Sequence, residues 1–289
     1  MVSSEALLSE FGRIVGPRHV LTDARATRRF SRGFRFGGGR VEAVVRPGTL
    51  VEQWRALKAA VAAGRIVIFQ AANTGLTGGS TPWGDDYDRP IVLISTMRLA
   101  KAHLIEDGRQ VVCLPGATLN QLEQLLRPLG REPHSVIGSS CLGASVLGGI
   151  ANNSGGALIQ RGPAYTELAL YAQVDATGAV ELVNHLGIAL GDDPEEILAR
   201  VERGDFGPVE ETGRWASDHD YVDHIREVDA ATPARFNADP RRLKEASGCA
   251  GKLGVFAVRL DTFPAEAATQ VFYIGTNDPA ELTRLPRQI

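Results

Sequence analysis

Apolar positions recur along the chain with two different periods, and each period predicts its own kind of element. Residues 4–15 place apolar side chains three and four positions apart, which predicts an amphipathic helix. Residues 41–45 and 66–69 are short apolar runs of the kind that form strands. The segment between them begins at Thr49, a favoured helix cap, and ends at Gly64. The sequence therefore predicts a helix followed by a strand–helix–strand unit.

The rest of the chain continues to mix strands and helices, and strands become more frequent toward its end. Strands are predicted at 91–94, 110–114, 168–174, 180–183, 254–260 and 271–275. Helices are predicted at 118–126, 142–152 and 194–201, with a last one beginning at Asp278. This order predicts a mixed α+β fold with two lobes.

Composition narrows the range of partners. The 31 lysines and arginines are balanced by 34 aspartates and glutamates, for a net charge of −3. Nucleic-acid binding usually requires a basic surplus, so no nucleic-acid partner is expected. No apolar run approaches the ~20 residues of a membrane span. The three cysteines suggest neither a disulfide framework nor a metal pair. His219 and His224 do not have the spacing that places two ligands on the same face of a helix, so no metal site is expected.

The clearest chemical signal is a glycine-rich loop. The strand at 66–69 runs directly into residues 70–80, QAANTGLTGGS, whose small residues allow successive backbone N–H groups to turn inward and bind anionic oxygens. The Walker A spacing is absent, and the following Thr81-Pro82 stretch cannot open a helix as a Rossmann loop does. Taken alone, the loop fits either a phosphate-binding nest or a glycine-rich hairpin that binds nothing.

A second cluster of glycine and serine spans residues 134–156, HSVIGSSCLGASVLGGIANNSGG. Small residues alternate there with apolar ones, which suits backbone that packs against a flat object, although a close helix–sheet crossing also uses glycine. Two such clusters in one chain favour an extended ligand of dinucleotide size. His134, at the head of the cluster, is expected to be packed or hydrogen-bonded rather than in contact with a ligand.

Both clusters, with RGPAYTELAL at 161–170, resemble the FAD-binding domain of the vanillyl-alcohol oxidase / p-cresol methylhydroxylase superfamily. Within it, the chain closely resembles the quinone-dependent D-lactate dehydrogenases of bacteria. The segments that carry it are 130–167, 182–191, 232–240, 247–263 and 271–277. The resemblance implies a two-lobed α+β domain of the p-cresol methylhydroxylase type with FAD between the lobes.

The resemblance also implies a division of the chain and a set of cofactor contacts. The parts are an N-terminal helix and basic segment (1–40), an FAD-binding domain (41–277, with lobes 41–115 and 116–277 and an irregular excursion at 203–240), and the start of a truncated cap region (278–289). The residues implied to wrap the FAD pyrophosphate are Ala71, Ala72, Asn73, Thr74, Gly75, Gly79 and Ser80. Those implied to lie beside the flavin are Gly138, Ser145, Gly155 and, through its backbone, Val255.

The resemblance implies that FAD is held without a covalent link, because the loop contains neither histidine nor cysteine. Cys141, in the second cluster, is the residue that could carry such a link. The alternative for Cys141 is a small buried apolar side chain.

The activity implied by the resemblance is oxidation of D-lactate to pyruvate, with electrons passed to membrane quinone. It implies a peripheral protein on the cytoplasmic side of the bacterial inner membrane, contacting an anionic membrane surface through parts outside this chain. Within the chain, the arginine-rich stretch 25–35 is interpreted as a solvated face. The substrate-binding and acid–base residues are expected outside residues 1–289, so no catalytic residue is assigned. The alternatives are a truncated FAD-binding module without activity and a related FAD-dependent 2-hydroxy-acid oxidoreductase.

Overall fold

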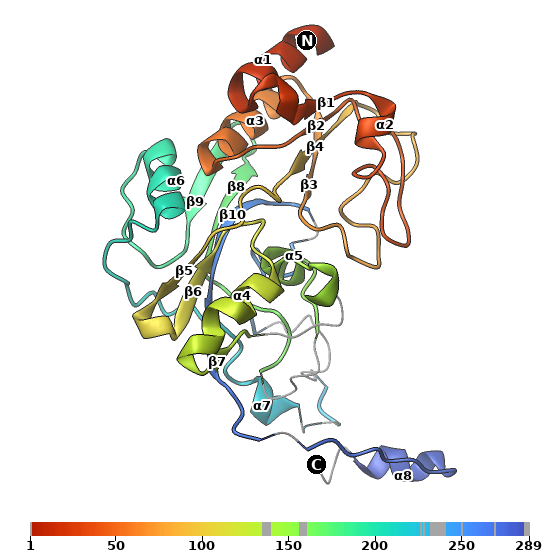
Figure 1. Cartoon of the computed structure of the whole chain (residues 1–289), viewed down its shortest axis with the longest axis vertical. Coiled ribbons are helices and arrows are strands. Elements are labelled where there is room, and N and C mark those ends of the chain that lie inside the picture. The colour runs from red at the N-terminus through yellow and green to blue at the C-terminus, as the bar shows by residue number, and fades with distance from the viewer. Residues whose placement is uncertain are drawn as a thin grey trace.

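Two β-sheets with helices packed against them form the fold (Figure 1). The computed structural model describes residues 2–134, 140–155, 161–225, 227, 229–231, 241–249, 251–268 and 270–285. The sequence prediction of a mixed α+β fold is confirmed.

The first sheet is mostly parallel and has the strand order β1-β2-β4-β3. Its strands are β1 (Val20–Leu21), β2 (Ala43–Val45), β3 (Ile66–Gln70) and β4 (Ile91–Ser95). β2 and β3 each pair in parallel with β4, whereas β1 is antiparallel to β2. The carboxyl ends of β2, β3 and β4 therefore lie at one edge of this sheet.

Two helices pack against the first sheet through their apolar stripes. They are α1 (Ser4–Val15) and α3 (Leu50–Ala62), which contact each other. Each begins where a hydroxyl accepts a backbone N–H: Ser3 from Ala6, at 3.2 Å, and Thr49 from Glu52, at 3.1 Å. The predicted cap at Thr49 is confirmed.

The second sheet is antiparallel and has the order β5-β6-β10-β8-β9. Its strands are β5 (Ala102–Ile105), β6 (Gln110–Cys113), β8 (Ala169–Val174), β9 (Val180–Asn184) and β10 (Gly254–Asp261). One face packs on α4 (Leu119–Leu126) and α5 (Val146–Ala151), and the other on α3 and α6 (Pro194–Arg203). β10 lies in the middle of the sheet, and all its residues but the last are buried.

The two sheets share a buried hydrophobic cluster. Val45 and Ile94 of the first sheet belong to the same buried cluster as Leu170 and Phe256 of the second. The sheets approach so closely where β3 and β10 meet that a Cβ on Gly254 would lie 2.9 Å from the ring of Phe69. The end of β3 is therefore fixed against the start of β10.

Short elements complete the described chain. The helical ones are η1 (Pro17–His19), α2 (Ala24–Thr27), η2 (Glu106–Gly108), η3 (Arg127–Leu129), η4 (Ser140–Leu142), α7 (Tyr221–His224) and α8 (Pro279–Arg284). β7 (Arg131–Glu132) and β11 (Phe263–Pro264) form a separate antiparallel pair. In Figure 1, α8 and the segment that leads to it lie below the body of the molecule.

The irregular excursion at 203–240 is tied to the second sheet where it is described. Arg242 lies 3.3 Å from Asp218, also bonds Asp220, and stacks over Trp215 at 3.8 Å. Ser217 donates to Asp261 at the end of β10, at 2.6 Å. This part of the chain is thus irregular but held by buried polar contacts.

Two predicted elements differ from the structure. The predicted strand at 271–275 is wrong: this stretch has no regular structure and its large apolar side chains are exposed. A strand requires a neighbour for its backbone hydrogen bonds, and no described strand lies beside this one. The predicted helix at 142–152 begins later, at Val146, because Gly143 is left-handed (φ 86°) and Ser145 caps the helix.

Candidate functional site

The glycine-rich loop lies at the carboxyl edge of the first sheet. It leaves β3 at Gln70, and residues 71–90 contain no helix, so the loop is not a helix N-terminus. In open sheets with parallel strands, ligands commonly bind outside the carboxyl ends of those strands. The position of the loop thus agrees with a ligand-binding role.

Asn73 shapes the first turn of this loop. Its backbone is left-handed, with φ 54°, a conformation that asparagine tolerates better than most residues. Its side chain donates to the carbonyl of Arg32, at 2.9 Å, and accepts from the Ser80 hydroxyl, at 3.0 Å. Two of the predicted pyrophosphate contacts therefore bond each other and close the loop.

Most of the remaining loop residues are at least partly exposed. Residues 71–74 are partly exposed, and Gly75 and Gly79 are exposed. A Cβ on Gly75 would meet no protein atom within 4 Å, whereas one on Gly78, which is left-handed at φ 74°, would lie 2.7 Å from the Phe36 carbonyl oxygen. Gly78 is required by the protein's own packing, and Gly75 borders open space.

Gln70 anchors the loop and was not among the predicted site residues. The side chain is buried, and its Nε2 donates to the carbonyls of Phe30 and Ser80, both at 2.8 Å. The Gln70 carbonyl accepts from Thr96 N, at 2.9 Å. The signal in the sequence is an amide side chain directly at the end of an apolar strand.

We expect Gln70→Leu to lower the free energy of unfolding by about 1–3 kcal/mol, because it leaves two carbonyl groups without their buried donor. Gln173→Leu is the matched control, since the Gln173 side chain donates to Glu181 at the surface; it should change stability by less than about 0.5 kcal/mol. Denaturant unfolding measures both, and equal effects would show that Gln70 does not anchor the loop.

The second cluster is only partly described. Gly138 lies outside the described residues. Ser145 is buried and its Oγ accepts from Gly148 N at 3.0 Å, so it caps α5. Gly155 is exposed, and a Cβ there would meet no protein atom within 4 Å. Cys141 is exposed, which corrects the prediction of a small buried side chain.

Val255 joins the second cluster to the first sheet. Its side chain is buried in the same apolar group as Ala144 and Val146 at the start of α5. Its carbonyl accepts from Gln53 Nε2 of α3, at 3.2 Å, so that oxygen already has a partner within the protein. Because Gly254 packs on Phe69, the structure brings Val255 close to the base of the loop.

His134 is buried without a partner. The ring is 3 % exposed, and neither ring nitrogen has a hydrogen-bond partner among the described residues. Burial, and then the Arg161 guanidinium, lower the pKa of His134 to about 4. Arg161 is itself held by the Pro133 carbonyl, at 3.0 Å, and by Glu132, at 2.8 Å. The histidine is packed, as predicted, and it forms no hydrogen bond to another described residue.

This burial predicts a pH dependence of stability. Between about pH 6.5 and pH 4 the unfolded chain binds a proton at His134 that the folded chain does not, so the free energy of unfolding falls as the pH falls, by roughly 3 kcal/mol across the window. Denaturant unfolding at pH 7 and pH 4.5 should show a smaller drop for His134→Gln than for the wild-type chain. Equal drops would mean that His134 protonates freely in the folded state.

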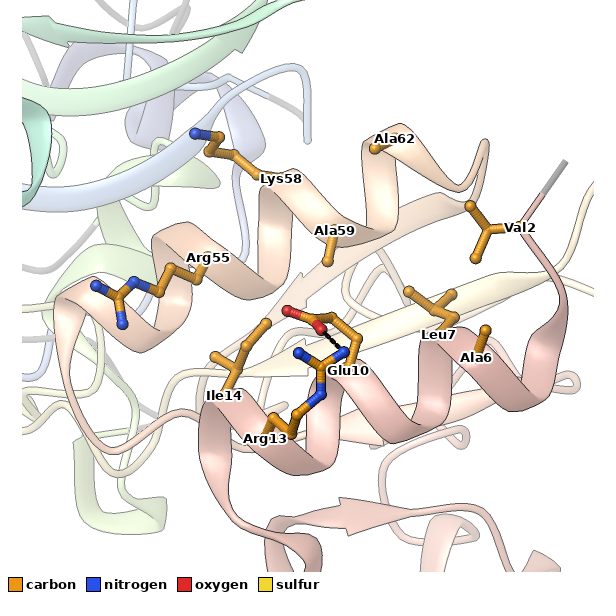
Figure 2. Close-up of a pocket in the computed structure, with 10 residues that line it drawn as sticks. All are labelled: Val2, Ala6, Leu7, Glu10, Arg13, Ile14, Arg55, Lys58, Ala59 and Ala62. Atoms are coloured by element: carbon orange, nitrogen blue, oxygen red, sulfur yellow. Dashed lines mark ion pairs between the residues drawn. The ribbon is translucent and has the colours of Figure 1, made fainter.

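A surface groove between α1 and α3 lies apart from this site (Figure 2). It encloses about 560 Å³, and its floor includes Leu7, Ile14 and Ala59. The ion pair of Glu10 with Arg13 lies along the α1 side of it. None of the predicted cofactor contacts lines this groove, so it does not contribute to the candidate site.

Neither a metal centre nor a membrane span emerges from the described ranges. No three histidine, cysteine or acidic side chains gather there as a metal ion would require. Every helix within those ranges is too short or too polar to cross a bilayer.

Comparison with known proteins gives both a family and a fold. Residues 41–183 match the model of the family described as FAD binding domain. The fold resembles that of alkyldihydroxyacetonephosphate synthase (TM-score 0.59, 14% identity, covering 93% of this chain and 42% of that one). It also resembles p-cresol methylhydroxylase (TM-score 0.56, 13% identity, covering 91% and 44%). The chain thus has the fold of the p-cresol methylhydroxylase type of FAD-binding enzymes.

Comparison with curated sequences identifies relatives that are much more similar in sequence than these solved structures. The chain is 59% identical over 288 residues to the quinone-dependent D-lactate dehydrogenase of Escherichia coli, covering 99% of this chain and 50% of the relative. It is 58% identical over 290 residues to that of Haemophilus influenzae, covering 100% and 51%. The chain is homologous to the N-terminal half of quinone-dependent D-lactate dehydrogenase, and it spans about half the length of these curated relatives.

Proposed function

We propose that the chain binds FAD non-covalently and forms the FAD-holding half of an enzyme that oxidises D-lactate to pyruvate. The observation that carries this proposal is the loop at 71–80, which presents the exposed glycines Gly75 and Gly79 at the carboxyl edge of the parallel strands. Homology to quinone-dependent D-lactate dehydrogenase supports the substrate and the electron acceptor.

The residues present fit an FAD pyrophosphate. Residues 70–80 contain no acidic side chain that would repel phosphate, and open space beside Gly75 leaves room for it. In this proposal, backbone groups of residues 71–75, with Gly79 and Ser80, hold the pyrophosphate. Backbone near Val255 and the residues Gly138, Ser145 and Gly155 lie beside the flavin.

Bound FAD would supply the redox chemistry by accepting a hydride from the substrate carbon. The contribution of this chain is to hold and orient the cofactor: Gln70 and Asn73 fix the shape of the loop, and the contact of Gly254 with Phe69 fixes the loop relative to β10. Residues 70–80 contain neither histidine nor cysteine, the residues that commonly carry a covalent flavin link, which supports non-covalent binding.

D-lactate and quinone are proposed as partners of the complete enzyme, by homology. Since quinones are membrane-borne electron acceptors, we place this enzyme at the cytoplasmic face of a bacterial inner membrane. Contact with an anionic membrane surface is assigned to parts that this chain does not span. A second candidate, an FAD-binding module without activity of its own, is favoured for the isolated chain because it spans about half of its relatives.

A fluorescence titration tests the cofactor assignment. FAD should bind saturably, FMN should bind at least tenfold more weakly, and ADP should compete with FAD, because the proposed loop holds the diphosphate that FAD and ADP share. Equal affinity for FMN and FAD, or no competition by ADP, would remove the loop from the binding site.

A further inference from the structure

A tight turn at residues 32–38 is held against the glycine-rich loop. Arg32 and Gly38 pair across the base of this turn as an antiparallel bridge. The Arg32 carbonyl accepts from the Asn73 side chain of the loop, at 2.9 Å. On the other arm of the turn, Gly38 N donates to the Pro82 carbonyl just beyond the loop, at 2.8 Å. The turn therefore has a fixed place beside the loop that is proposed to hold a diphosphate.

The loop itself has no charged side chain to offer a diphosphate. None of residues 70–80 is lysine, arginine, aspartate or glutamate. Backbone N–H groups in a concave turn bind anionic oxygens without a cation. Hydrogen bonds from arginine to phosphate are, however, roughly twice as strong as bonds between neutral groups. A cation beside the loop would thus strengthen FAD binding more than a further neutral donor would.

The segment that leads into the turn supplies such cations. Residues 25–35 contain five arginines, and the backbone order makes them neighbours of the loop; they are Arg25, Arg28, Arg29, Arg32 and Arg35, and all are exposed. Among the described residues, no carboxylate forms an ion pair with any of the five. Arg40, by contrast, lies 3.8 Å from Asp85. Positive charge therefore collects beside the loop without a paired carboxylate.

Arg32 is the one of the five that is tied to a predicted diphosphate contact, because its own carbonyl bonds Asn73. Arg25 lies within α2, and Arg35 lies at the tip of the turn. A guanidinium presents planar paired donors that match the geometry of phosphate oxygens. Arg32 thus combines the required charge, the required shape and a fixed position at the loop.

We propose that Arg32 binds the diphosphate of FAD and supplies the positive charge that the loop lacks. The role of Arg32 rests on the proposed function, since it requires the diphosphate to lie at the loop. The cofactor site would then include a residue that lies before both the family match at 41–183 and the predicted FAD-binding domain at 41–277. Arg32 would no longer belong to a merely solvated face, which is the sequence interpretation of residues 25–35.

FAD titrations of Arg32→Ala test the proposal. The turn is bonded to the loop through the Arg32 carbonyl, so the substitution leaves that bond in place. The affinity for FAD should fall by about tenfold, the lower end of what a hydrogen bond to a charged group contributes, because Arg32 stays close to solvent. The affinity for ADP should fall by the same factor, since both ligands carry the diphosphate. Arg32→Lys should recover part of the loss, because lysine keeps the charge but not the planar pair of donors.

Arg25→Ala is the matched control. It removes the same charge from the same basic segment, and its effect on FAD affinity should be less than about twofold, because exposed charges that do not contact the ligand are screened by salt. Both alanine variants should unfold at the wild-type temperature, since both side chains are exposed.

The salt dependence of binding separates a charge contact from a change in loop shape. FAD affinity of the wild-type chain should fall as the salt concentration rises from about 0.05 M to about 0.5 M, because salt screens the attraction between guanidinium and diphosphate. In Arg32→Ala this fall should be smaller. A displaced loop would weaken binding equally at both salt concentrations.

The possible failures are distinguishable. If the wild-type chain does not bind FAD, the proposed function itself is wrong, and the role of Arg32 with it. If the wild-type chain binds FAD and Arg32→Ala binds it equally well, only the role of Arg32 is overturned. Equal losses in Arg25→Ala and Arg32→Ala, an unchanged salt dependence in Arg32→Ala, or a loss for FAD without a loss for ADP would also overturn that role.

Discussion

The 289-residue chain, loaded with FAD and mixed with D-lactate without oxygen, should reduce its flavin at least about 10⁴-fold more slowly than the full-length Escherichia coli relative. Hydride transfer requires a substrate held about 3–3.5 Å from the reacting atom, and misplacement alone can cost about 10²-fold. Loss of a positioned general base typically costs a further ~10²–10⁴-fold. The chain supplies a cradle for the cofactor, while no residue of it is assigned to bind or deprotonate the substrate.

Stopped-flow absorbance of the flavin measures both rates. The full-length relative provides the positive control, and L-lactate should leave both proteins oxidised on the same time scale. Rapid bleaching of the 289-residue chain by D-lactate would place the substrate site within these residues. It would contradict the proposal that this chain holds FAD but does not bind and deprotonate the substrate.

Gly75→Val should weaken FAD binding by about 10- to 100-fold while leaving the fold intact. A Cβ at Gly75 meets no protein atom within 4 Å, and the backbone there is not left-handed, so the substitution should leave the loop in place and act on a ligand beside it. Forcing extra carbon atoms into an occupied site typically costs about 1–3 kcal/mol. Thr77→Ala should have a smaller effect, of about tenfold at most, because one neutral hydrogen bond contributes about 0.5–1.5 kcal/mol.

Gly275→Val is the matched control for this experiment. Gly275 also borders open space and is exposed, but it lies far along the chain from the loop. FAD titrations of the three variants, with thermal unfolding as a check of the fold, separate the cases. Equal FAD affinities for Gly75→Val and Gly275→Val would mean that no ligand group lies beside Gly75.

Most elements could be predicted from the sequence because their signals are local. The helix at 4–15 is confirmed as α1, and the apolar runs at 66–69 and 91–94 are confirmed as β3 and β4. β5 (Ala102–Ile105) was missed because it is short, contains His103, and is a strand only through its pairing with β6. The opposite error at 271–275 has the same cause, since strand propensity without a neighbour produces no ladder.

The candidate site, too, could be predicted only as far as its signals are local in the sequence. Glycine spacing indicated the loop, but it could not distinguish Gly78, which faces the Phe36 carbonyl, from Gly75, which faces open space. The role of Gln70 depends on Phe30, forty positions away, and that contact exists only in the folded chain. Long-range contacts of this kind leave no periodic signal in a single sequence.

The central claim is that the chain holds FAD, and the most direct measurement is to identify the chromophore that the purified protein releases. The protein is denatured and the supernatant is separated by chromatography against FAD, FMN and riboflavin standards. The account predicts FAD in the supernatant and none bound covalently to the precipitated polypeptide. If the isolated protein carries no flavin, it should bind FAD on reconstitution. Recovery of FMN, flavin that remains on the polypeptide, or no binding after reconstitution with FAD would contradict it.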